Sequence, residues 1–417
     1  MTDYDREKLS AVFSEHAIPF AFESTDLADP QKKNLKQLFA DIDIVGLGEH
    51  SHGTREVFQL KHAMFQFLVE ELGFRVLAFE TDFSGGLAID NYVTGGDSDS
   101  RELLRRDGVH SIWECEAILD LVNWMRDFNV ERPPEDQVRF FGMDLYWSRP
   151  TFLEAYLDRS GQADLVVKLE SELTYLEEES PAIDLDIGDP EKYAATQRRV
   201  ARAIQERLES ERTTIVERTS EEEWWLGNKA TEVLEKTGRL WEEMHDEDAD
   251  SFGFRSVEMA KHALWFRDFI DTEKMAVWAH NSHIYRHELL EDDRENPRGL
   301  GLHFAAREGL SYFSLGFLAG IESVRVYSMD EKEFETLERK ELPEDSLGAL
   351  LAQSESDPIL IDFRSIPNAE PVSAWLDLPP TLTYIGGRGE LEHYDANPLA
   401  ECDGMVFVNR GTPTQEI

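Results

Sequence analysis

Short runs of β-branched and aromatic residues, each bounded by turn-forming residues, mark the buried strands of this chain. The clearest runs cover residues 42–49, 74–80, 137–144, 274–281, 310–317 and 403–409, with 358–363 as a further candidate. Between the first two runs, residues 54–74 carry apolar side chains at helical spacing, and Gly73 is a natural helix stop. Strands that alternate with helices predict a mostly parallel sheet covered on both faces. The expected fold class is therefore α/β, with a three-layer α/β/α core.

The pattern changes over about residues 151–270, where strand-like runs vanish and apolar residues recur at helical spacing. Leu226, Ala230 and Val233 belong to one such series. This region predicts a large helical insertion. No linker rich in Pro, Gly and Ser and no internal repeat divides the chain. We therefore expect a single domain over residues 1–417 that includes the insertion.

The charge of the chain restricts its partners. The chain has 85 acidic residues and 42 basic ones, which gives a formal charge of −43. Such a surface repels polyanions, so we expect neither nucleic acid nor an anionic membrane as a partner. An excess of this size opposes folding unless salt screens it. The composition therefore predicts a halophilic protein that works at high ionic strength.

The cysteines and the N-terminus favour a cytoplasmic location. Cys115 and Cys402 are the only cysteines, and they form neither a disulfide framework nor a zinc knuckle. The segment MTDYDREKLS lacks the apolar core of a signal peptide. No run reaches the roughly eighteen uninterrupted apolar residues that suggest a membrane span. We expect a soluble protein in a reducing compartment, and the sequence does not indicate its oligomeric state.

Side chains suited to acid–base chemistry follow the predicted strands. They are Glu49 and His52 after the first strand, Glu80 at the end of the second, Asp144 at the end of the third, and His280 and His283 after the fourth. Ligands of parallel sheets bind beyond the carboxyl ends of the strands, so these side chains are expected at one site. Taken singly, each has a structural explanation as a cap or a hydrogen-bonded loop residue. Their concurrence favours a catalytic site.

The residue types at these strand ends are suited to hydrolysis. His52 beside a carboxylate can take a proton from water near neutral pH, while Glu49 fixes its tautomer and stabilises the imidazolium. Lys61, Arg255 and Arg286 are candidates for the positive charge that a hydrolytic site needs. Lys61 is equally consistent with an ordinary residue on an exposed helix face.

Other motifs lead to competing hypotheses or to none. The segment GLGEHSHG does not match G-x-G-x-x-G, the chain has no Walker sequence, and Ser51 is out of register for a G-x-S-x-G elbow. A divalent-metal hydrolase is a more serious alternative, because the His50/His52 and His280/His283 pairs offer metal ligands. A third hypothesis is a non-catalytic binding protein with a degenerate pocket.

Six motifs carry a resemblance to a known family. They are GEHSHGTREVFQLK, FETD followed by NYVTGG, VRFFGMD, FRSVEMAKHALWF, WAHNSHIYR and CDGMVFVNRGTP, which run from about residue 40 to the C-terminus. In this order they resemble the erythromycin esterase-like proteins. The resemblance implies an α/β/α fold and a hydrolase that opens macrolide lactone rings, a reaction linked to antibiotic resistance. It implies a small-molecule ester or lactone as the substrate, with no cofactor and no firmly established catalytic metal.

The resemblance also assigns roles by position. His52 matches the general base that activates water, and Glu49 matches the glutamate that accompanies it. The expected catalytic residues are Glu49, His52, Glu80 and His283, and the expected substrate-binding residues are Lys61, Arg255, His280 and Asp144. His50 stands where the family more often has a small residue, so we expect it to be local variation. Ser256 and His262 also depart from the family pattern, which predicts an altered pocket beside Arg255.

Overall fold

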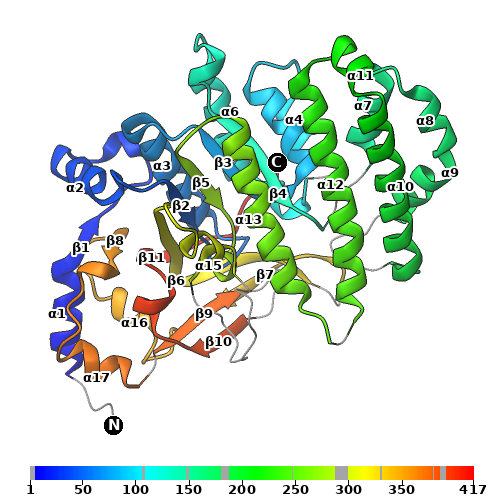
Figure 1. The fold of residues 1–417 in the computed structure, drawn as a ribbon. Helices are drawn as coiled ribbons and strands as arrows, with labels where there is room; N and C mark the ends of the chain where they lie inside the picture. The colour runs from blue at the N-terminus through cyan, green and yellow to red at the C-terminus, as the bar shows by residue number, and fades with distance from the viewer. Residues whose placement is uncertain are drawn as a thin grey trace.

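A central mixed sheet organises the protein, whose computed structural model describes residues 5–105, 109–146, 150–179, 187–246, 248–286, 299–328, 331–378, 380–385 and 391–417. The strands are β1 (Ala17–Pro19), β2 (Ile44–Leu47), β3 (Val76–Asp82), β4 (Arg139–Asp144), β5 (Met275–Trp278), β6 (Tyr312–Ser328), β7 (Glu333–Arg339), β8 (Ile359–Asp362) and β11 (Gly404–Gly411). They follow the order β1-β8-β11-β6-β2-β5-β3-β4, and β7 pairs with β6 (Figure 1). Neighbours from β11 to β4 are parallel, whereas β1, β7 and β8 are antiparallel to their partners.

The apolar runs predicted most of this sheet. Each predicted strand is present as β2, β3, β4, β5, β6, β8 or β11. The runs did not reveal β1, β7 or the separate hairpin of β9 (Thr381–Ile385) and β10 (Leu391–Asp395). The strand β7 has the charged sequence EFETLER, and most of its residues are exposed or half-exposed. A criterion based on buried apolar runs misses such an edge strand.

Alternate residues of the central strands pack into two separate cores, one on each face of the sheet. In β3, Val76 and Ala78 belong to one core, while Leu77 and Phe79 belong to the other. The helices α13 (Ser251–Phe269) and α15 (Leu300–Ala305) contribute to the first core, and α2 (Asp29–Phe39), α3 (Arg55–Leu72) and α6 (Glu116–Asn129) contribute to the second. The three-layer α/β/α class is therefore confirmed.

The predicted helical insertion is present between β4 and β5. It comprises α7 (Thr151–Arg159), α8 (Ala163–Lys168), α9 (Glu170–Glu178), α10 (Pro190–Ser210), α11 (Arg212–Arg218), α12 (Glu221–Met244) and α13. The helices α7 to α12 lie beside the sheet on the right of Figure 1. The last helix, α13, contacts β4 and carries Arg255 to the site described below.

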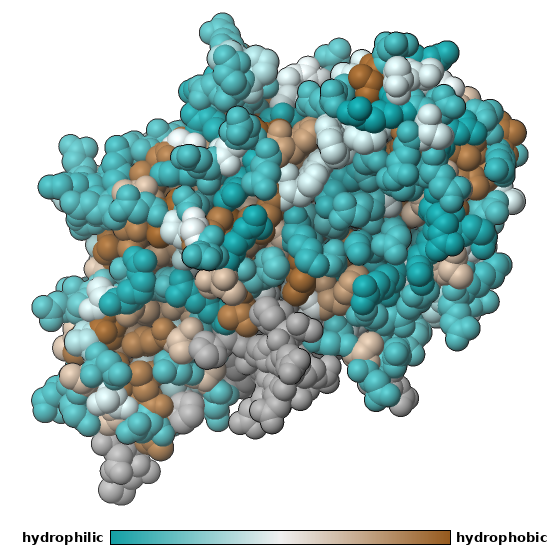
Figure 2. Space-filling model, viewed as in Figure 1, coloured by the Kyte–Doolittle hydropathy of each residue, from teal (hydrophilic) through white to brown (hydrophobic). Residues whose placement is uncertain are grey.

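Shorter helices complete the described chain. They are α1 (Arg6–His16), α4 (Phe83–Val93), α5 (Ser100–Leu104), α14 (Asn281–Ile284), α16 (Leu347–Leu351), α17 (Val372–Leu376) and α18 (Pro398–Glu401), with 3-10 turns η1 (Ser24–Asp26), η2 (Ser111–Trp113), η3 (Pro134–Asp136) and η4 (Phe363–Ser365). None of the helices in the described residues has the length and apolarity to cross a bilayer. On the face shown in Figure 2, hydrophilic residues predominate and apolar residues form separate patches.

Candidate active site

The parallel strands β2, β5, β3 and β4 end at one edge of the sheet. Leu47 of β2 and Phe79 of β3 both pair with Trp278 of β5. Glu49 and Glu80 follow one or two residues beyond this level, so their side chains reach the same edge. This is the edge at which parallel sheets place their ligands.

A β-bulge in β3 lies at Glu80. Phe79 pairs with Gly142 of β4, whereas Asp82 pairs with Asp144, so β3 has one more residue than β4 between these two pairs. Bulges of this kind bend a strand and redirect its side chains, and they recur beside active sites. The carboxylate that ends the second predicted strand is therefore presented by an irregular backbone.

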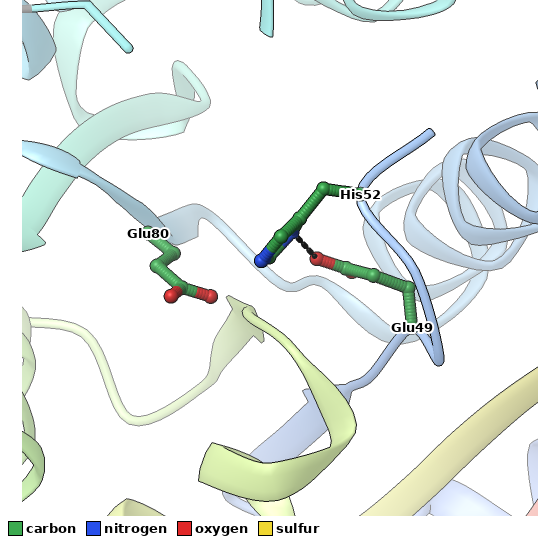
Figure 3. A group of neighbouring side chains, drawn as sticks. All are labelled: Glu49, His52 and Glu80. Atoms are coloured by element: carbon green, nitrogen blue, oxygen red, sulfur yellow. Dashed lines mark hydrogen bonds and ion pairs between the residues drawn. The ribbon is translucent and has the colours of Figure 1, made fainter. Parts of the chain in front are cut away.

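His52 is held by a buried carboxylate–ammonium pair. Its Nδ1 lies 3.1 Å from Oε1 of Glu49, and Lys61 of α3 forms an ion pair with Oε2 of the same carboxylate. Glu49 and Lys61 are fully buried, whereas 13% of the His52 side chain is exposed. Figure 3 shows the His52 ring between Glu49 and Glu80. The ionised Glu49 carboxylate can only accept a hydrogen bond, so Nδ1 of His52 carries the proton. Nε2 is left with a lone pair that can take a proton.

The surroundings of His52 keep its ring neutral. Burial lowers the pKa of His52 below the ordinary value of 6.5, against the raising effect of the Glu80 charge. Arg255 lowers this pKa further, and Asp144 raises it. A neutral imidazole at physiological pH is the form that a general base requires.

Aromatic rings fix the position of the imidazole. Trp113 meets the His52 ring edge to face at 5.2 Å between centroids, and the His280 ring lies at 5.1 Å. The Trp113 indole N–H donates to the main-chain carbonyl of Glu80 at 2.9 Å, so Trp113 bonds to the bulge as well. Burial and the neighbouring His52 lower the pKa of His110 to about 3. Sequence reasoning did not single out Trp113 or His110, because neither follows a predicted strand.

Arg255 of α13 binds three side chains of the site. Its Nε and Nη2 donate to the two oxygens of Asp144 at 2.8 and 2.6 Å. Nη2 also lies 2.9 Å from Oε1 of Glu80, and Nη1 lies 2.9 Å from Nε2 of His283. The guanidinium stands over the Tyr146 ring at 4.2 Å. Since all three nitrogens are engaged, Arg255 holds Glu80, Asp144 and His283 in position.

Glu80 is ionised and linked to His283 of α14 and to His280, the residue before this helix. Its Oε1 lies 3.3 Å from Nε2 of His283, and its Oε2 accepts the main-chain N–H of His280 at 2.8 Å. Burial raises the pKa of Glu80, but His283, Arg255 and His52 together hold it well below the ordinary value of 4.5. A carboxylate in this state accepts hydrogen bonds from water and cannot donate a proton.

His283 contacts Arg255, Glu80 and Ser256. Its Nδ1 lies 3.0 Å from Oγ of Ser256, and its ring stacks on Phe252 with centroids 4.9 Å apart. An arginine only donates, so the neutral ring accepts from Arg255 at Nε2 and donates from Nδ1 to Ser256. A ring protonated at Nε2 donates toward Glu80 instead. Ser256 thus gives His283 a hydroxyl partner.

His50, one of the ligands in the alternative metal-site hypothesis, lies outside the site. His50 turns away from His52, and its Nε2 lies 2.8 Å from Oε1 of Glu322 on β6. Arg339 of β7 lies 2.7 Å from the same oxygen, and the Thr54 hydroxyl donates to Oε2 of Glu322 at 2.7 Å. The His50 side chain is fully buried. His50 and His52 therefore do not share a metal, because their rings serve different networks.

A different set of donors meets at the site. Glu49, His52 and Glu80 each place one ligand atom within 4.8 Å of the others, and these donor types suit a divalent metal. Both carboxylates already have a cationic partner, Lys61 for Glu49 and Arg255 for Glu80. A metal ion would have to compete with these two cations.

The predicted residues converge in two linked clusters. One contains Glu49, His52 and Lys61, and the other contains Glu80, Asp144, Arg255, His280 and His283. Lys61 and Asp144 are fully buried and support their neighbours from behind. Arg286 does not join them, because its Nη2 donates to the main-chain oxygen of Tyr312 at 2.9 Å and pairs with Asp403.

Sequence comparison assigns the chain to a family. The erythromycin esterase family model matches residues 69–411. The chain belongs to the erythromycin esterase family. It is 25% identical over 322 residues to erythromycin esterase type II of Escherichia coli, covering 72% of this chain and 74% of that protein. It is 23% identical over 416 residues to YbfO of Bacillus subtilis (strain 168), provisionally named a hydrolase, covering 96% of this chain and 90% of that protein.

Solved structures share the fold of this family member. A structure described as a succinoglycan biosynthesis protein has a TM-score of 0.82 at 21% identity and covers 99% of both chains. A Bacillus cereus protein has a TM-score of 0.80 at 23% identity, with 99% of this chain and 100% of that chain covered. A histidine-to-asparagine variant of the erythromycin esterase EreC in its open conformation has a TM-score of 0.67 at 16% identity, covering 95% of this chain and 97% of that chain.

Proposed function

We propose that this protein hydrolyses an ester or lactone bond with water activated by His52. Membership of the erythromycin esterase family supports a hydrolase. The observation that carries the mechanism is the orientation of His52, whose Nδ1 is bonded to Glu49 while the ring lies beside Glu80 (Figure 3). This arrangement leaves a basic nitrogen next to an ionised carboxylate that can hold a water molecule.

In the first step, Nε2 of His52 takes a proton from water as the water oxygen bonds to the carbonyl carbon. Glu80 accepts a hydrogen bond from the other O–H of the water. Glu80 and the buried Glu49 both stabilise the imidazolium that forms on His52. The carbonyl π electrons move to the carbonyl oxygen and give a tetrahedral oxyanion. The proton taken by His52 remains on the enzyme for the second step.

In the second step, the tetrahedral intermediate reforms its carbonyl and expels the alkoxide, which takes the proton held by His52, or a proton from His283 that the imidazolium of His52 then replaces. His283 suits this role because its Nε2 lies 2.9 Å from Nη1 of Arg255 and 3.3 Å from Oε1 of Glu80. Donors at the developing oxyanion supply the remaining stabilisation. Water adds across the bond, so the products are a carboxylic acid and an alcohol.

A metal-dependent hydrolase is the second candidate. The ligand atoms of Glu49, His52 and Glu80 within 4.8 Å of one another support it. Lys61 and Arg255 favour the metal-free reaction, because they already neutralise the two carboxylates. Dialysis against a chelator separates the two mechanisms, since only the metal enzyme loses activity and regains it when the ion is restored.

Macrolactones are the proposed substrate class, with other cyclic or linear esters as alternatives. The name of the Escherichia coli relative, an erythromycin esterase, supports this choice. A role in antibiotic resistance is part of the proposal. We test it by mass spectrometry of macrolides, lactones, esters and cell extract incubated in high salt with wild type and with His52→Ala. A product heavier by one water in the wild-type sample alone supports the proposal. Equal conversion by both proteins removes His52 from the mechanism, and no conversion of any compound favours the non-catalytic binding protein.

A further inference from the structure

A second group of polar side chains lies in the helical insertion, beside a cavity. This cavity has a volume of about 690 Å³, and its lining includes Lys229 and Glu232 of α12 and Trp265 of α13. It contains none of the catalytic residues proposed above. Glu232 meets Glu258 and His262 of α13 here, and the ligand atoms of these three residues lie within 4.8 Å of one another.

The geometry of His262 fixes which of its nitrogens is available. Its Nδ1 lies 3.1 Å from the main-chain oxygen of Met143 on β4. A carbonyl oxygen only accepts, so Nδ1 carries the proton and Nε2 carries a lone pair. The His262 side chain is fully buried, and among the described residues its Nε2 has no hydrogen-bond partner. Burial and the nearby Lys229 lower the pKa of His262 well below its ordinary value, which keeps the ring neutral.

Nε2 is the nitrogen of His262 that remains available to a ligand, and a ring nitrogen of His262 lies within 4.8 Å of both carboxylates. Glu258 and His262 are four residues apart on α13 and so share one helix face. We infer that Glu232, Glu258 and His262 bind a divalent transition-metal ion, with Zn²⁺ as the first candidate. One imidazole and two carboxylates are donors that Zn²⁺ accepts, with bonds of about 2.0–2.2 Å, so the side chains draw closer around the ion. The Met143 carbonyl supplies the outer hydrogen bond that metal-binding histidines usually make.

Two lysines compete with the ion for these carboxylates. Lys229 donates to Oε1 of Glu232 at 2.9 Å, and Lys261 donates to Oε1 of Glu258 at 2.7 Å. Each carboxylate has a second oxygen that can bind the ion, and the exposed Glu232 gives access from solvent, since 47% of its side chain is accessible. The competition with the two ammonium groups limits the affinity of the site for the ion.

The position of the ion gives it a structural role. It joins α12 to α13, and the outer bond to Met143 joins both helices to β4. The next residue, Asp144, holds Arg255 in the proposed active site. The ion therefore stabilises the contact between the helical insertion and the sheet at a point adjoining the catalytic network.

The test uses the full chain in a His52→Ala background, which removes the histidine of the Glu49, His52 and Glu80 set. The protein is stripped with a chelator, and Zn²⁺ binding is measured by competition with a colorimetric indicator. We expect one Zn²⁺ per chain and a rise in melting temperature on binding. His262→Gln and Glu258→Gln should each weaken binding at least about tenfold. Glu232→Gln should do the same without disturbing the fold, because its side chain is exposed.

His245→Gln is the matched control. The Nδ1 of His245 also lies near a main-chain oxygen, that of Trp241 at 2.9 Å, but His245 lies outside the proposed ligand set. The Zn²⁺ affinity of the His245→Gln variant should equal that of the His52→Ala background protein. The inference is overturned if the background protein binds no Zn²⁺, or if Glu232→Gln and His262→Gln bind it as tightly as the background does. Co²⁺ replacing Zn²⁺ should give a visible absorption band that His262→Gln alters.

Discussion

His50 and His52 are two residues apart in the sequence, and each pairs with a different buried glutamate. The two pairs serve different purposes. His52 meets Glu49 at 3.1 Å, and His50 meets Glu322 at 2.8 Å. Arg339 closes the second pair, which lies entirely inside the protein. The His52 ring is partly exposed and adjoins an ionised carboxylate. The comparison shows that a histidine–carboxylate contact alone does not define a catalytic base, since access to the other ring nitrogen decides its use.

The largest effect on this comparison is expected from His52→Ala. Loss of a general base should lower kcat by on the order of a hundredfold to ten-thousandfold. The free energy of unfolding should change by only about 1 kcal/mol, because the Glu49–Lys61 ion pair remains. Steady-state kinetics and urea unfolding on one preparation measure both quantities. Normal turnover in this variant would mean that the two histidine pairs do not differ in function.

Glu322→Gln should give the opposite result. The substitution leaves His50 and Arg339 buried beside a neutral amide, and breaking a buried ion pair of this kind costs about 3–5 kcal/mol. The folded variant should keep the kcat of the wild type. Glu338→Gln on the same hairpin is the control, because the Glu338 carboxylate bonds to Ser323 on the surface. A loss of kcat in the folded Glu322→Gln variant would show that the His50–Glu322 pair contributes to catalysis.

Glu49→Gln should lower both kcat and stability, and a double variant separates the two losses. The single variant leaves the Lys61 amine buried without its carboxylate, which should lower the free energy of unfolding by roughly 3–5 kcal/mol. The double variant Glu49→Gln with Lys61→Met removes both charges, so it should recover most of that stability. It should not recover kcat, since the imidazolium of His52 lacks its buried counter-charge. Recovery of kcat along with stability would reduce Glu49 to a structural role.

Local order in the sequence was enough to predict which side chains follow the parallel strands. The βαβ pattern placed Glu49, His52 and Glu80 after parallel strands, and parallel strand ends meet at one edge. Pairings across long sequence separations were not available to this reasoning. The bond between Arg255 and Asp144 spans 111 residues, and only the fold shows that Asp144, Glu80 and His283 together engage every nitrogen of the guanidinium.

The missed features share a physical origin. Trp113 contacts His52 from a 3-10 turn that no periodicity marks, and the direction of His50 depends on the position of Glu322 in β6. The adjacent letters E-H-S-H do not show which ring faces the sheet and which faces the site. A charged edge strand such as β7 was also invisible, although its Arg339 completes the His50 network.

The pH dependence of hydrolysis should report which histidine is the base. Burial lowers the pKa of His52 below 6.5, so its base form persists as the pH falls and is lost only below the ordinary histidine range. The acid limb of kcat/KM should therefore lie below pH 6.5. Because the Glu80 charge raises the pKa of His52, Glu80→Gln should move the residual acid limb to still lower pH. A limb above pH 6.5, or one that Glu80→Gln moves upward, would assign the titration to another group.

Salt should change the stability of the whole protein. It should have the smallest effect on the stability difference between wild type and Glu322→Gln. With a charge of −43, self-repulsion falls as salt shortens the screening length from about 10 Å at 0.1 M to about 3 Å at 1 M, so the free energy of unfolding in urea should rise. The pair of His50 with Glu322 is shielded from solvent ions by burial. The stability difference between wild type and Glu322→Gln should therefore stay within about 0.5 kcal/mol across this range. A difference that shrinks with salt would show that solvent ions reach the pair, and stability that falls with salt would contradict the predicted halophilic character.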